Sequence, residues 1–299
     1  MRDNNKKNLL IILNPVAGRR LQRKFNNIVN ILQKNGLSVT IKETRYAGHG
    51  KEIAGENVNE GYDMIIAAGG DGTINEVING IYPHQIAFGI IPLGTANVLA
   101  KEISLGEKAN DIADCLINGH SSPCWLGKAN GRYFTLMTSV GLDSLAVAHV
   151  STRLKKNIGK GAYALSFIWQ VIKSKNIIYQ VTSDGKIHSA YNVIITNGRL
   201  YGGQYICAPK ARLEDKKLYL LLAQRGGRFN ALKYAYLMLS QKYPESRTVT
   251  TLPITQATIK CGHDNIPVQI DGDAIGCLPA EVSLSEYALN LIRPVETNM

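Results

Sequence analysis

The chain has 299 residues, a net charge of +11, and a composition in which 45% of residues are hydrophobic and 19% are charged. These values exclude a largely disordered protein, and the length allows one large or two medium domains. No apolar run approaches the roughly 18 residues of a membrane-spanning helix, so we expect any membrane association to be peripheral.

The first ~120 residues alternate between strand and helix patterns, as in a parallel sheet with crossover helices. Predicted strands cover residues 8–13, 37–44, 62–70 and 85–94. Predicted helices cover residues 21–35, 48–61, 73–81, 95–103 and 110–119. Gly36 is a stop signal for the first of these helices. The alternation predicts an α/β domain with a parallel sheet over residues 1–124.

The pattern changes after Pro123. Residues 124–141 are typical of a hairpin around the turn dipeptide Asn130-Gly131. A helix is predicted over about 142–173, strands within 176–198, 217–227 and 256–262, and another helix over 228–243. Residues 125–299 are therefore predicted to form a second, mostly antiparallel and β-rich domain.

The excess of positive charge lies in this second domain. Residues 1–124 hold 13 Lys and Arg against 12 Asp and Glu, whereas residues 125–299 hold 21 against 11. A basic half favours an anionic partner, which can be a membrane surface, a nucleic acid or a phosphorylated substrate, although a solvated basic surface has the same composition. The five cysteines form no C-x-x-C pair, which favours reduced cytosolic thiols over a disulfide framework.

The sequence Gly-Gly-Asp-Gly-Thr at 69–73 follows a strand-like run and opens a helix. Glycines let the backbone approach a ligand closely, and the N–H groups at a helix N-terminus attract anions. The order of strand, glycine turn and helix therefore predicts a phosphate-binding site. Thr73 and Glu76 have the spacing of a capping box, and apolar residues at helical spacing continue to position 81.

This turn matches neither of two common nucleotide motifs. The chain contains no G-x-x-x-x-G-K-[ST] loop, and residues 69–73 lack the third glycine of the dinucleotide fingerprint. Residues 159–164 match that fingerprint loosely but do not follow a predicted strand. A carboxylate among phosphate-binding N–H groups is unfavourable without a cation. Asp71 is therefore a candidate to organise Mg²⁺ beside a polyphosphate, the alternative being a turn residue.

Several motifs occur in the order that is found in one known family. They are LNPVAG at 13–18, ETRYAGHGKEIA at 43–54, GGDGTINEV at 69–77, PLGTANVLA at 92–100, APKARLEDKKLYL at 208–220 and VQIDGD at 268–273. With these motifs the sequence resembles the catalytic domain of diacylglycerol kinases, in particular the soluble bacterial lipid kinases that are related to sphingosine kinases. GGDGT alone is shared with NAD kinases, so its combination with PLGTAN and the late DGD carries the resemblance.

The resemblance implies an ATP-dependent lipid kinase with two domains and an interdomain cleft for the nucleotide. It places ATP against Asn14, Thr44, Gly69, Gly70, Asp71, Gly72, Thr73, Ile74, Asn75 and Thr95. It makes Asp273, the last acidic residue of the D-G-[ED] element, the catalytic base. It also implies a structural Mg²⁺ in the second domain, bound by the carboxylate of Asp215 and the backbone carbonyls of Arg212 and Lys217.

Two residues depart from the family pattern. Asp273 stands where many members have Glu, which shortens the side chain by one methylene but keeps a carboxylate. Lys216 stands where a Gly usually follows the Asp of the metal-binding segment. Lysine would strain this loop if the position requires a positive φ.

The residues and the resemblance together predict transfer of the γ-phosphoryl group of Mg-ATP to a lipid hydroxyl whose proton Asp273 accepts. Asp271 and Asp71 are predicted to organise Mg²⁺ or to orient neighbouring groups, although spacing alone makes IDGD a hairpin turn. An NAD kinase is the alternative among enzymes. A non-catalytic nucleotide- or nucleic-acid-binding protein is the alternative from another class, but no RNA-binding signature with interleaved aromatics accompanies the basic half.

The predicted partner is a lipid alcohol, either diacylglycerol-like or sphingoid-like, which a cytoplasmic protein reaches at the inner face of an anionic membrane. Residues 153–175 are the sequence candidate for that contact, because lysines and an arginine flank an apolar centre with Phe167 and Trp169. A core helix with basic ends has the same pattern. No nucleic acid is expected as a partner.

Overall fold

The computed structural model describes residues 7–18, 21–142, 144–145 and 176–295. The chain divides into two compact units, which are unit 1 with Met1–Cys124 and Tyr287–Met299, and unit 2 with Trp125–Glu286. The helix predicted over 142–173 falls almost entirely outside the described residues. The basic stretch 153–175 and the fingerprint-like stretch 159–164 fall wholly outside them.

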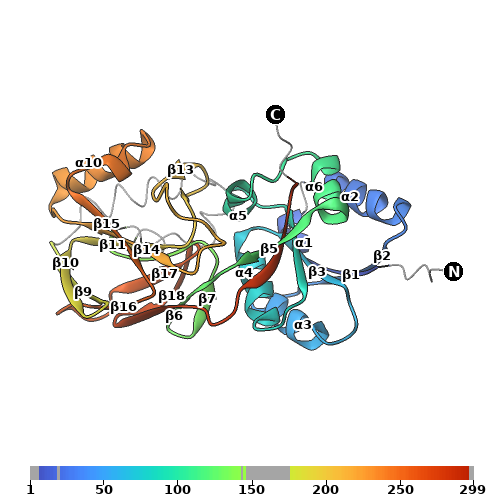
Figure 1. Ribbon diagram of the computed structural model, residues 1–299, viewed down its shortest axis with the longest axis horizontal. Coiled ribbons are helices and arrows are strands. Elements are labelled where there is room, and N and C mark those ends of the chain that lie inside the picture. The colour runs from blue at the N-terminus through green and yellow to red at the C-terminus, as the bar shows by residue number, and fades with distance from the viewer. Residues whose placement is uncertain (1–6, 19–20, 143, 146–175, 296–299) are drawn as a thin grey trace. The chain divides into compact units, whose positions relative to one another are not determined.

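Unit 1 is an α/β unit around one six-stranded sheet (Figure 1). Its elements are β1 (Asn8–Leu13), α1 (Pro15–Gly18), α2 (Gln22–Lys34), β2 (Ser38–Glu43), α3 (His49–Asn57), β3 (Met64–Gly69), α4 (Asp71–Ile81), β4 (Ala87–Pro92), α5 (Val98–Glu102), α6 (Ala109–Asn118), β5 (His120–Cys124) and β20 (Leu289–Arg293). The strand order is β2-β1-β3-β4-β20-β5. The first five strands are parallel, and only β5 runs antiparallel to its neighbour β20.

Burial explains why β1, β3 and β4 are central in this sheet. All residues of β3 are buried, and so are all residues of β1 and β4 except the first of each, whereas the edge strand β2 is mostly exposed. A strand that is covered on both faces has an almost continuous run of apolar residues in its sequence. Figure 1 shows helices α2 and α6 on one face of the sheet and helices α3 and α4 on the other face. The loops that follow the parallel strands lie at one edge of the sheet, between these two helical layers.

The strand β20 brings the end of the chain back into this first sheet. We expected residues 125–299 to belong together, but Asn290 and Leu291 pair in parallel with Ala87 and Phe88 of β4. The alternation of Leu and Asn in this segment indicates a strand, but nothing local specifies its partner. Pairing between segments so distant in sequence is decided by which sheet edge the folded chain leaves available.

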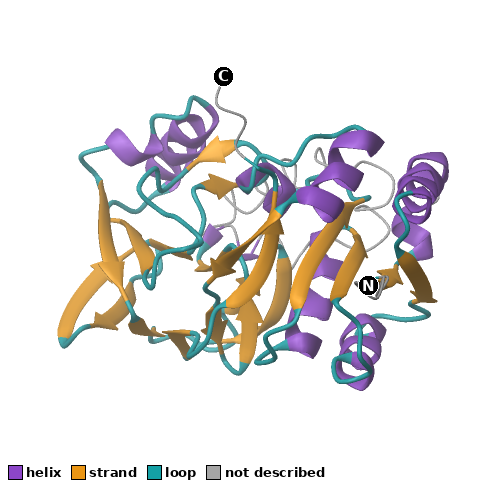
Figure 2. Ribbon diagram, turned by 45° about the vertical axis from the view of Figure 1, so that its right-hand side comes forward, coloured by secondary structure: helices purple, strands orange, loops and turns teal. Residues whose placement is uncertain are grey.

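Unit 2 is built almost entirely from antiparallel strands (Figure 2). Its elements are β6 (Gly127–Ala129), β7 (Arg132–Phe134), β8 (Met137–Val140), β9 (Tyr179–Ser183), β10 (Lys186–Ala190), β11 (Asn192–Thr196), β12 (Leu200–Tyr201), β13 (Tyr205–Ile206), β14 (Leu218–Ala223), α10 (Arg228–Leu239), the 3-10 helix η2 (Tyr243–Glu245), β15 (Val249–Ile254), β16 (Gln256–Lys260), β17 (Pro267–Ile270), β18 (Asp273–Cys277) and β19 (Ala280–Leu284). The second sheet has the order β10-β9-β16-β19-β6-β7, and the third sheet has the order β15-β14-β11-β8-β17-β18.

The second and third sheets enclose one hydrophobic core. Val181 and Val282 contribute to it from the second sheet, and Val193 and Leu220 contribute from the third. Alternating inward-facing residues from two antiparallel sheets are the hallmark of a β-sandwich. The predicted fold class, with an α/β part followed by a mostly antiparallel β-rich part, is therefore confirmed.

Short-range turn chemistry was predicted well in unit 2. Asn130 and Gly131 connect β6 to β7, and their φ angles are 46° and 86°. Two successive positive φ angles are those of a type I′ turn, which suits the twist of a two-residue hairpin. The predicted hairpin around this dipeptide is confirmed.

The outer face of the third sheet is covered by α10 and η2. Met238 of α10 and Tyr243 of η2 pack in a second cluster with Tyr219 and Leu221 of β14. Neither α10 nor any other helix in the described part of the chain has both the length and the hydrophobicity of a membrane span.

Candidate nucleotide and phosphoryl-transfer site

The residues predicted to surround ATP all lie in unit 1, in loops that follow four neighbouring parallel strands. Asn14 follows β1, Thr44 follows β2, the turn at 69–75 follows β3, and Thr95 follows β4. Because parallel strands end at the same edge of a sheet, these loops converge there, where open α/β sheets bind their ligands. The fold thus brings together loops whose residues lie up to about a quarter of the chain apart, from Asn14 to Thr95.

Backbone hydrogen bonds continue the sheet into these loops. The N–H of Asn14 donates to the carbonyl of Ala68 at 2.9 Å, and the N–H of Leu93 donates to the carbonyl of Gly69 at 2.8 Å. The N–H of Thr44 donates to the last carbonyl of β1 at 2.8 Å. Each loop therefore begins from a fixed position on the strand beside it.

The Asn14 side chain links two of the loops. Its Nδ2 donates to Oγ1 of Thr73 at 3.0 Å, and its Oδ1 accepts from the N–H groups of Val16 at 3.1 Å and Ala17 at 3.3 Å. One amide thus satisfies the N-terminus of α1 and holds the first turn of α4. The structure explains why an asparagine, with a donor and an acceptor on one short side chain, suits this position.

The predicted capping box of Thr73 and Glu76 is wrong. The N-cap of α4 is Gly70, and no side chain caps it. The Glu76 carboxylate instead accepts the N–H groups of Gly48 at 2.8 Å and Gly50 at 3.0 Å, at the start of α3. The spacing within α4 matched the motif, but α3 packs against α4 and brings closer donors to the carboxylate. Glu76 therefore supports the segment after β2, a role that the sequence did not indicate.

Asp71 connects the glycine turn to the loop after β4. Its Oδ1 accepts the N–H of Val98, the first residue of α5, at 2.7 Å. Burial raises the pKa of Asp71, and backbone hydrogen bonds from Val98, Leu99 and Asn97 oppose that rise. A carboxylate near a helix N-terminus is favourable because it satisfies an N–H group that lacks an intrahelical partner. Asp71 thus positions α5, and its predicted role in organising Mg²⁺ stays a prediction.

The glycine turn and the loop after β4 touch backbone to backbone. A Cβ atom at Gly94 would lie 2.6 Å from Cα of Gly70, so only glycine fits there. The side chain of Asn97, a residue in the left-handed conformation at φ 48°, bonds both the N–H and the carbonyl of Gly94, at 2.9 and 3.0 Å. Asn97 was present in the PLGTAN motif, but only the structure reveals this bracing role. Thr95, at the tip of the loop, is exposed.

Three of the predicted nucleotide contacts have buried side chains. Thr73 is 6% exposed, Ile74 is 2% exposed and Asn75 is 1% exposed. The amide nitrogen of Asn79 donates to both the carbonyl and Oδ1 of Asn75. These side chains belong to the interior of unit 1. Any contribution of Ile74 to nucleotide binding must therefore come from its backbone.

In unit 2, the DGD element forms the hairpin between β17 and β18. Asp271 and Gly272 have φ angles of 46° and 88°, as in a type I′ turn. The Asp271 carboxylate accepts three backbone N–H groups, from Thr135 at 2.9 Å, Leu136 at 3.0 Å and Met137 at 2.9 Å. Three donors leave little capacity for a metal ion, so Asp271 anchors the turn to the strand beside it.

Asp273 is the first residue of β18, at the edge of the third sheet. One of its carboxylate oxygens lies 4.0 Å from Nη2 of Arg132, and the two side chains are 46% and 36% exposed. An ion pair this exposed contributes little stability. The carboxylate is therefore accessible, with a cation beside it and a tightly bonded turn before it. Sequence reasoning missed Arg132, which is distant in sequence and belongs to no quoted motif.

The segment predicted to hold a structural metal contains an ion pair. Nζ of Lys217 lies 3.1 Å from a carboxylate oxygen of Asp215, and this hydrogen bond raises the pKa of Lys217. The carbonyl of Arg212 accepts the N–H of Asp215 at 3.1 Å. In this arrangement the ammonium group of Lys217 neutralises the carboxylate of Asp215. The described residues of this segment therefore suit this lysine–aspartate ion pair better than a bound Mg²⁺ ion.

Lys216 does not strain this segment as the sequence suggested it could. It is not among the described residues with positive φ, and its ammonium lies 4.8 Å from the centroid of the Trp125 ring, a cation–π contact. Within the described residues, no group of three or more His, Cys, Asp or Glu side chains gathers to bind a metal.

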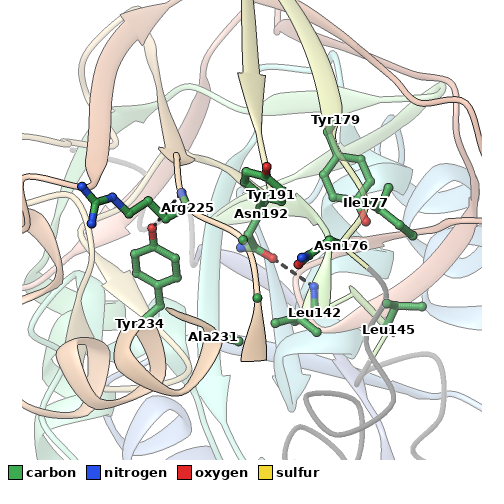
Figure 3. A pocket seen from close by; sticks show the side chains of 12 residues that line it. Leu142, Leu145, Asn176, Ile177, Tyr179, Tyr191, Asn192, Arg225, Ala231 and Tyr234 are labelled. Atoms are coloured by element: carbon green, nitrogen blue, oxygen red, sulfur yellow. Dashed lines mark hydrogen bonds between the residues drawn. The ribbon is translucent and has the colours of Figure 1, made fainter. Parts of the chain in front are cut away.

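A small cavity lies in unit 2 beside the start of α10 (Figure 3). Its volume is about 50 Å³, and its lining includes Leu142, Leu145 and Ile177 together with Asn192 and Arg225. Oδ1 of Asn192 accepts the N–H of Leu142 at 3.0 Å. This space suits a few water molecules, and it is too small for an acyl chain.

Two family models match the chain. The diacylglycerol kinase catalytic domain matches residues 8–129. The YegS C-terminal NAD kinase beta sandwich-like domain matches residues 137–293, and this second match alone covers more than half of the chain. The chain belongs to the diacylglycerol kinase family. This membership confirms the resemblance carried by the GGDGT, PLGTAN and DGD motifs, and it implies a kinase that uses ATP.

Curated members of the family are similar over nearly the full length. A diacylglycerol kinase of Bacillus subtilis (strain 168) is 29% identical over 298 residues, 96% of each chain, and one of Staphylococcus carnosus (strain TM300) is 27% identical over 92% of this chain and 91% of that one. A crystal structure of a diacylglycerol kinase from Bacillus anthracis str. Sterne has a TM-score of 0.79 at 23% identity, covering 98% of each chain. The protein therefore has the same fold as the Bacillus anthracis kinase.

Proposed function

We propose that this diacylglycerol kinase family member transfers the γ-phosphoryl group of ATP to the hydroxyl group of a diacylglycerol-like lipid. The observation that carries the proposal is the convergence of four loops at the carboxyl edge of the first sheet, where the N-terminus of α4 begins in a glycine turn. The names of the similar proteins support a diacylglycerol-like acceptor over a sphingoid-like one.

The nucleotide side of the proposal rests on unit 1. The N–H groups in the first turn of α4 bind the phosphates, and Gly94 and Gly70 allow the backbone to come close. Asp71 keeps α5 and its loop in place through Val98. Magnesium, bound with ATP, supplies charge neutralisation on the phosphate oxygens during transfer.

The acceptor side rests on Asp273. A neutral alcohol is a weak nucleophile, so a carboxylate that accepts its proton while the bond to phosphorus forms accelerates transfer by about 10²–10⁴. The γ-phosphoryl group moves to the lipid oxygen, ADP leaves, and the proton passes to Asp273. The bonded turn at Asp271 fixes the backbone that carries this carboxylate. We also infer that the protein acts as a peripheral protein at the cytoplasmic face of a membrane, because the acceptor is a lipid.

Labelled ATP offered with a diacylglycerol, a sphingoid base or NAD tests the function. We expect labelled phosphatidic acid, and Asp273→Asn should lose at least a hundredfold in kcat while keeping its affinity for ATP. Asp264→Asn is the matched control, because Asp264 is an exposed carboxylate in the same unit. Full activity in Asp273→Asn would contradict the assignment of the base. Label on NAD alone would favour an NAD kinase, and no transfer to any acceptor would favour a binding protein.

A further inference from the structure

Helix α10 carries a stripe of large apolar side chains that are about half exposed or more. Phe229 is 91% exposed, Leu232 49%, Tyr236 65% and Leu239 61%. Steps of three and four residues place these side chains on one face of the helix. Large apolar residues that are exposed singly are normal, but a contiguous row of four indicates an interaction surface.

The opposite face of α10 explains why this row points outward. Ala231 and Met238 are buried, and Tyr234 and Leu237 pack on the cluster that covers the third sheet. The helix is therefore apolar on both faces, whereas a surface helix is usually polar on its outer face. The core of unit 2 accounts for only one of the two faces.

The helix is held firmly enough to present that outer face. Oη of Tyr234 accepts the N–H of Arg225 at 3.1 Å and donates to the carbonyl of Thr248 at 3.3 Å, and its ring lies beside Arg225 in Figure 3. Asn230 donates to the carbonyl of Gly226 at 2.6 Å. Contacts at its start and its middle fix α10 on the sandwich, in the orientation that Figure 1 shows for unit 2.

Basic residues border the stripe. Lys233 lies four residues after Phe229 and three before Tyr236, and Arg228 lies four before Leu232, so both occupy its margins. The segment 224–248 holds five exposed cations (Arg225, Arg228, Lys233, Lys242 and Arg247) against one acidic residue (Glu245). An apolar stripe with cations along its margins matches the boundary between acyl chains and anionic headgroups.

We propose that α10 is a membrane-docking helix, whose Phe229, Leu232, Tyr236 and Leu239 enter the headgroup region of an anionic bilayer while Arg228 and Lys233 contact lipid phosphates. The inference rests on the proposed function, since a lipid kinase must bind its acceptor at a bilayer. It names a different segment from the basic stretch 153–175. A second copy of the chain suits the stripe less well, because two such helices would bring their cations together.

Vesicle flotation tests the docking directly and requires no catalysis. The variants are the double substitution Phe229→Ser with Tyr236→Ser and the single substitution Lys233→Gln. Ile187→Ser is the matched control, because Ile187 is 73% exposed on β10 of the second sheet. Vesicles of phosphatidylcholine with and without phosphatidylglycerol separate the apolar contribution from the charge contribution.

We expect the wild type to bind vesicles that contain phosphatidylglycerol and to lose binding as salt is added. The apolar double variant should bind at least tenfold more weakly, Lys233→Gln about fivefold more weakly, and Ile187→Ser as well as the wild type. Wild-type binding by the double variant or by Lys233→Gln would overturn the inference. So would a dimer, seen by light scattering, that the double variant dissociates without any change in vesicle binding.

A second measurement separates this inference from the proposed function. With a diacylglycerol dispersed in detergent, the α10 variants should phosphorylate the lipid as fast as the wild type, and the defect should appear only with vesicles. Wild-type protein that binds vesicles through α10 but transfers no phosphate would contradict the function and leave the docking intact. Equal activity of all variants on vesicles would contradict the docking and leave the function intact.

Discussion

A substitution of Asp271 tests whether this first aspartate of the DGD element has a structural role or binds a metal ion. Its carboxylate accepts the N–H groups of Thr135, Leu136 and Met137, with Oδ1 shared between the last two. Asp271→Asn changes one oxygen into a donor and leaves the backbone turn unchanged. We expect the variant to fold less stably and to hold Asp273 less well.

The magnitude follows from the three bonds. The amide oxygen of asparagine keeps the two N–H groups that Oδ1 accepts, and the amide nitrogen then faces the N–H of Thr135. One hydrogen bond to a charged group is lost, and a buried N–H is left without an acceptor, at a cost of about 3 kcal/mol. For a unit of this size, 3 kcal/mol lowers the melting temperature by about 6–12 °C.

Tryptophan fluorescence is the suitable assay, because Trp125 and Trp169 both fall in the sequence of unit 2. Urea titration of the wild type, Asp271→Asn and the control Asp264→Asn gives the free energy of unfolding of this unit. Steady-state kinetics at several Mg²⁺ concentrations then separates a lower kcat, expected from a displaced Asp273, from a weaker response to Mg²⁺.

The metal-ligand interpretation makes the opposite prediction. If Asp271 bound Mg²⁺, the asparagine variant would unfold like the wild type and would need more Mg²⁺ for the same rate. A change in unfolding free energy below about 0.5 kcal/mol, the range of ordinary surface substitutions, together with a raised Mg²⁺ requirement would refute our interpretation of the hydrogen bonds.

Three further outcomes are expected. Gly94→Ala should lower stability by about 1–3 kcal/mol and weaken ATP binding in a titration, whereas Gly55→Ala, whose Cβ meets only one atom at 3.6 Å, should do neither. Burial raises the pKa of Asp71, so the protonated carboxyl group favours the folded state, and this contribution to stability is lost as pH rises through the folded pKa. The wild type should therefore be more stable relative to Asp71→Asn near the ordinary aspartate pKa of about 3.9 than at about pH 7, when denaturation is measured at both. Because Lys217 neutralises Asp215, adding a chelator should leave the melting temperature of the wild type unchanged, and a drop would indicate a bound metal.

Most elements of the fold could be predicted from local patterns. Continuous apolar runs identified β1, β3 and β4, and Asn130-Gly131 identified a hairpin, because burial on both faces and positive φ each select particular residues. The return of β20 to the first sheet could not be predicted, because its short strand pattern does not specify a partner.

The candidate site was predicted in its parts and not in its connections. The motifs identified the glycine turn, and the structure then showed Asn14 bonded to Thr73 and Asp71 bonded to Val98. The capping box failed because Glu76 found better donors in a neighbouring helix. A side chain with several possible partners takes those that packing brings closest, and a sequence does not contain those distances.

The sequence by itself determined the family, the order of the motifs and the two kinds of architecture, because these depend on residue types and on spacing along the chain. Only the tertiary structure decided what each charged group does. In the folded chain, the carboxylates of Asp71 and Asp271 accept backbone N–H groups, whereas the carboxylate of Asp273 is accessible beside Arg132. Helix α10 has a second apolar face that is exposed. Hydrogen bonds and burial depend on distances between segments that are remote in sequence, and these distances exist only after the sheets have formed.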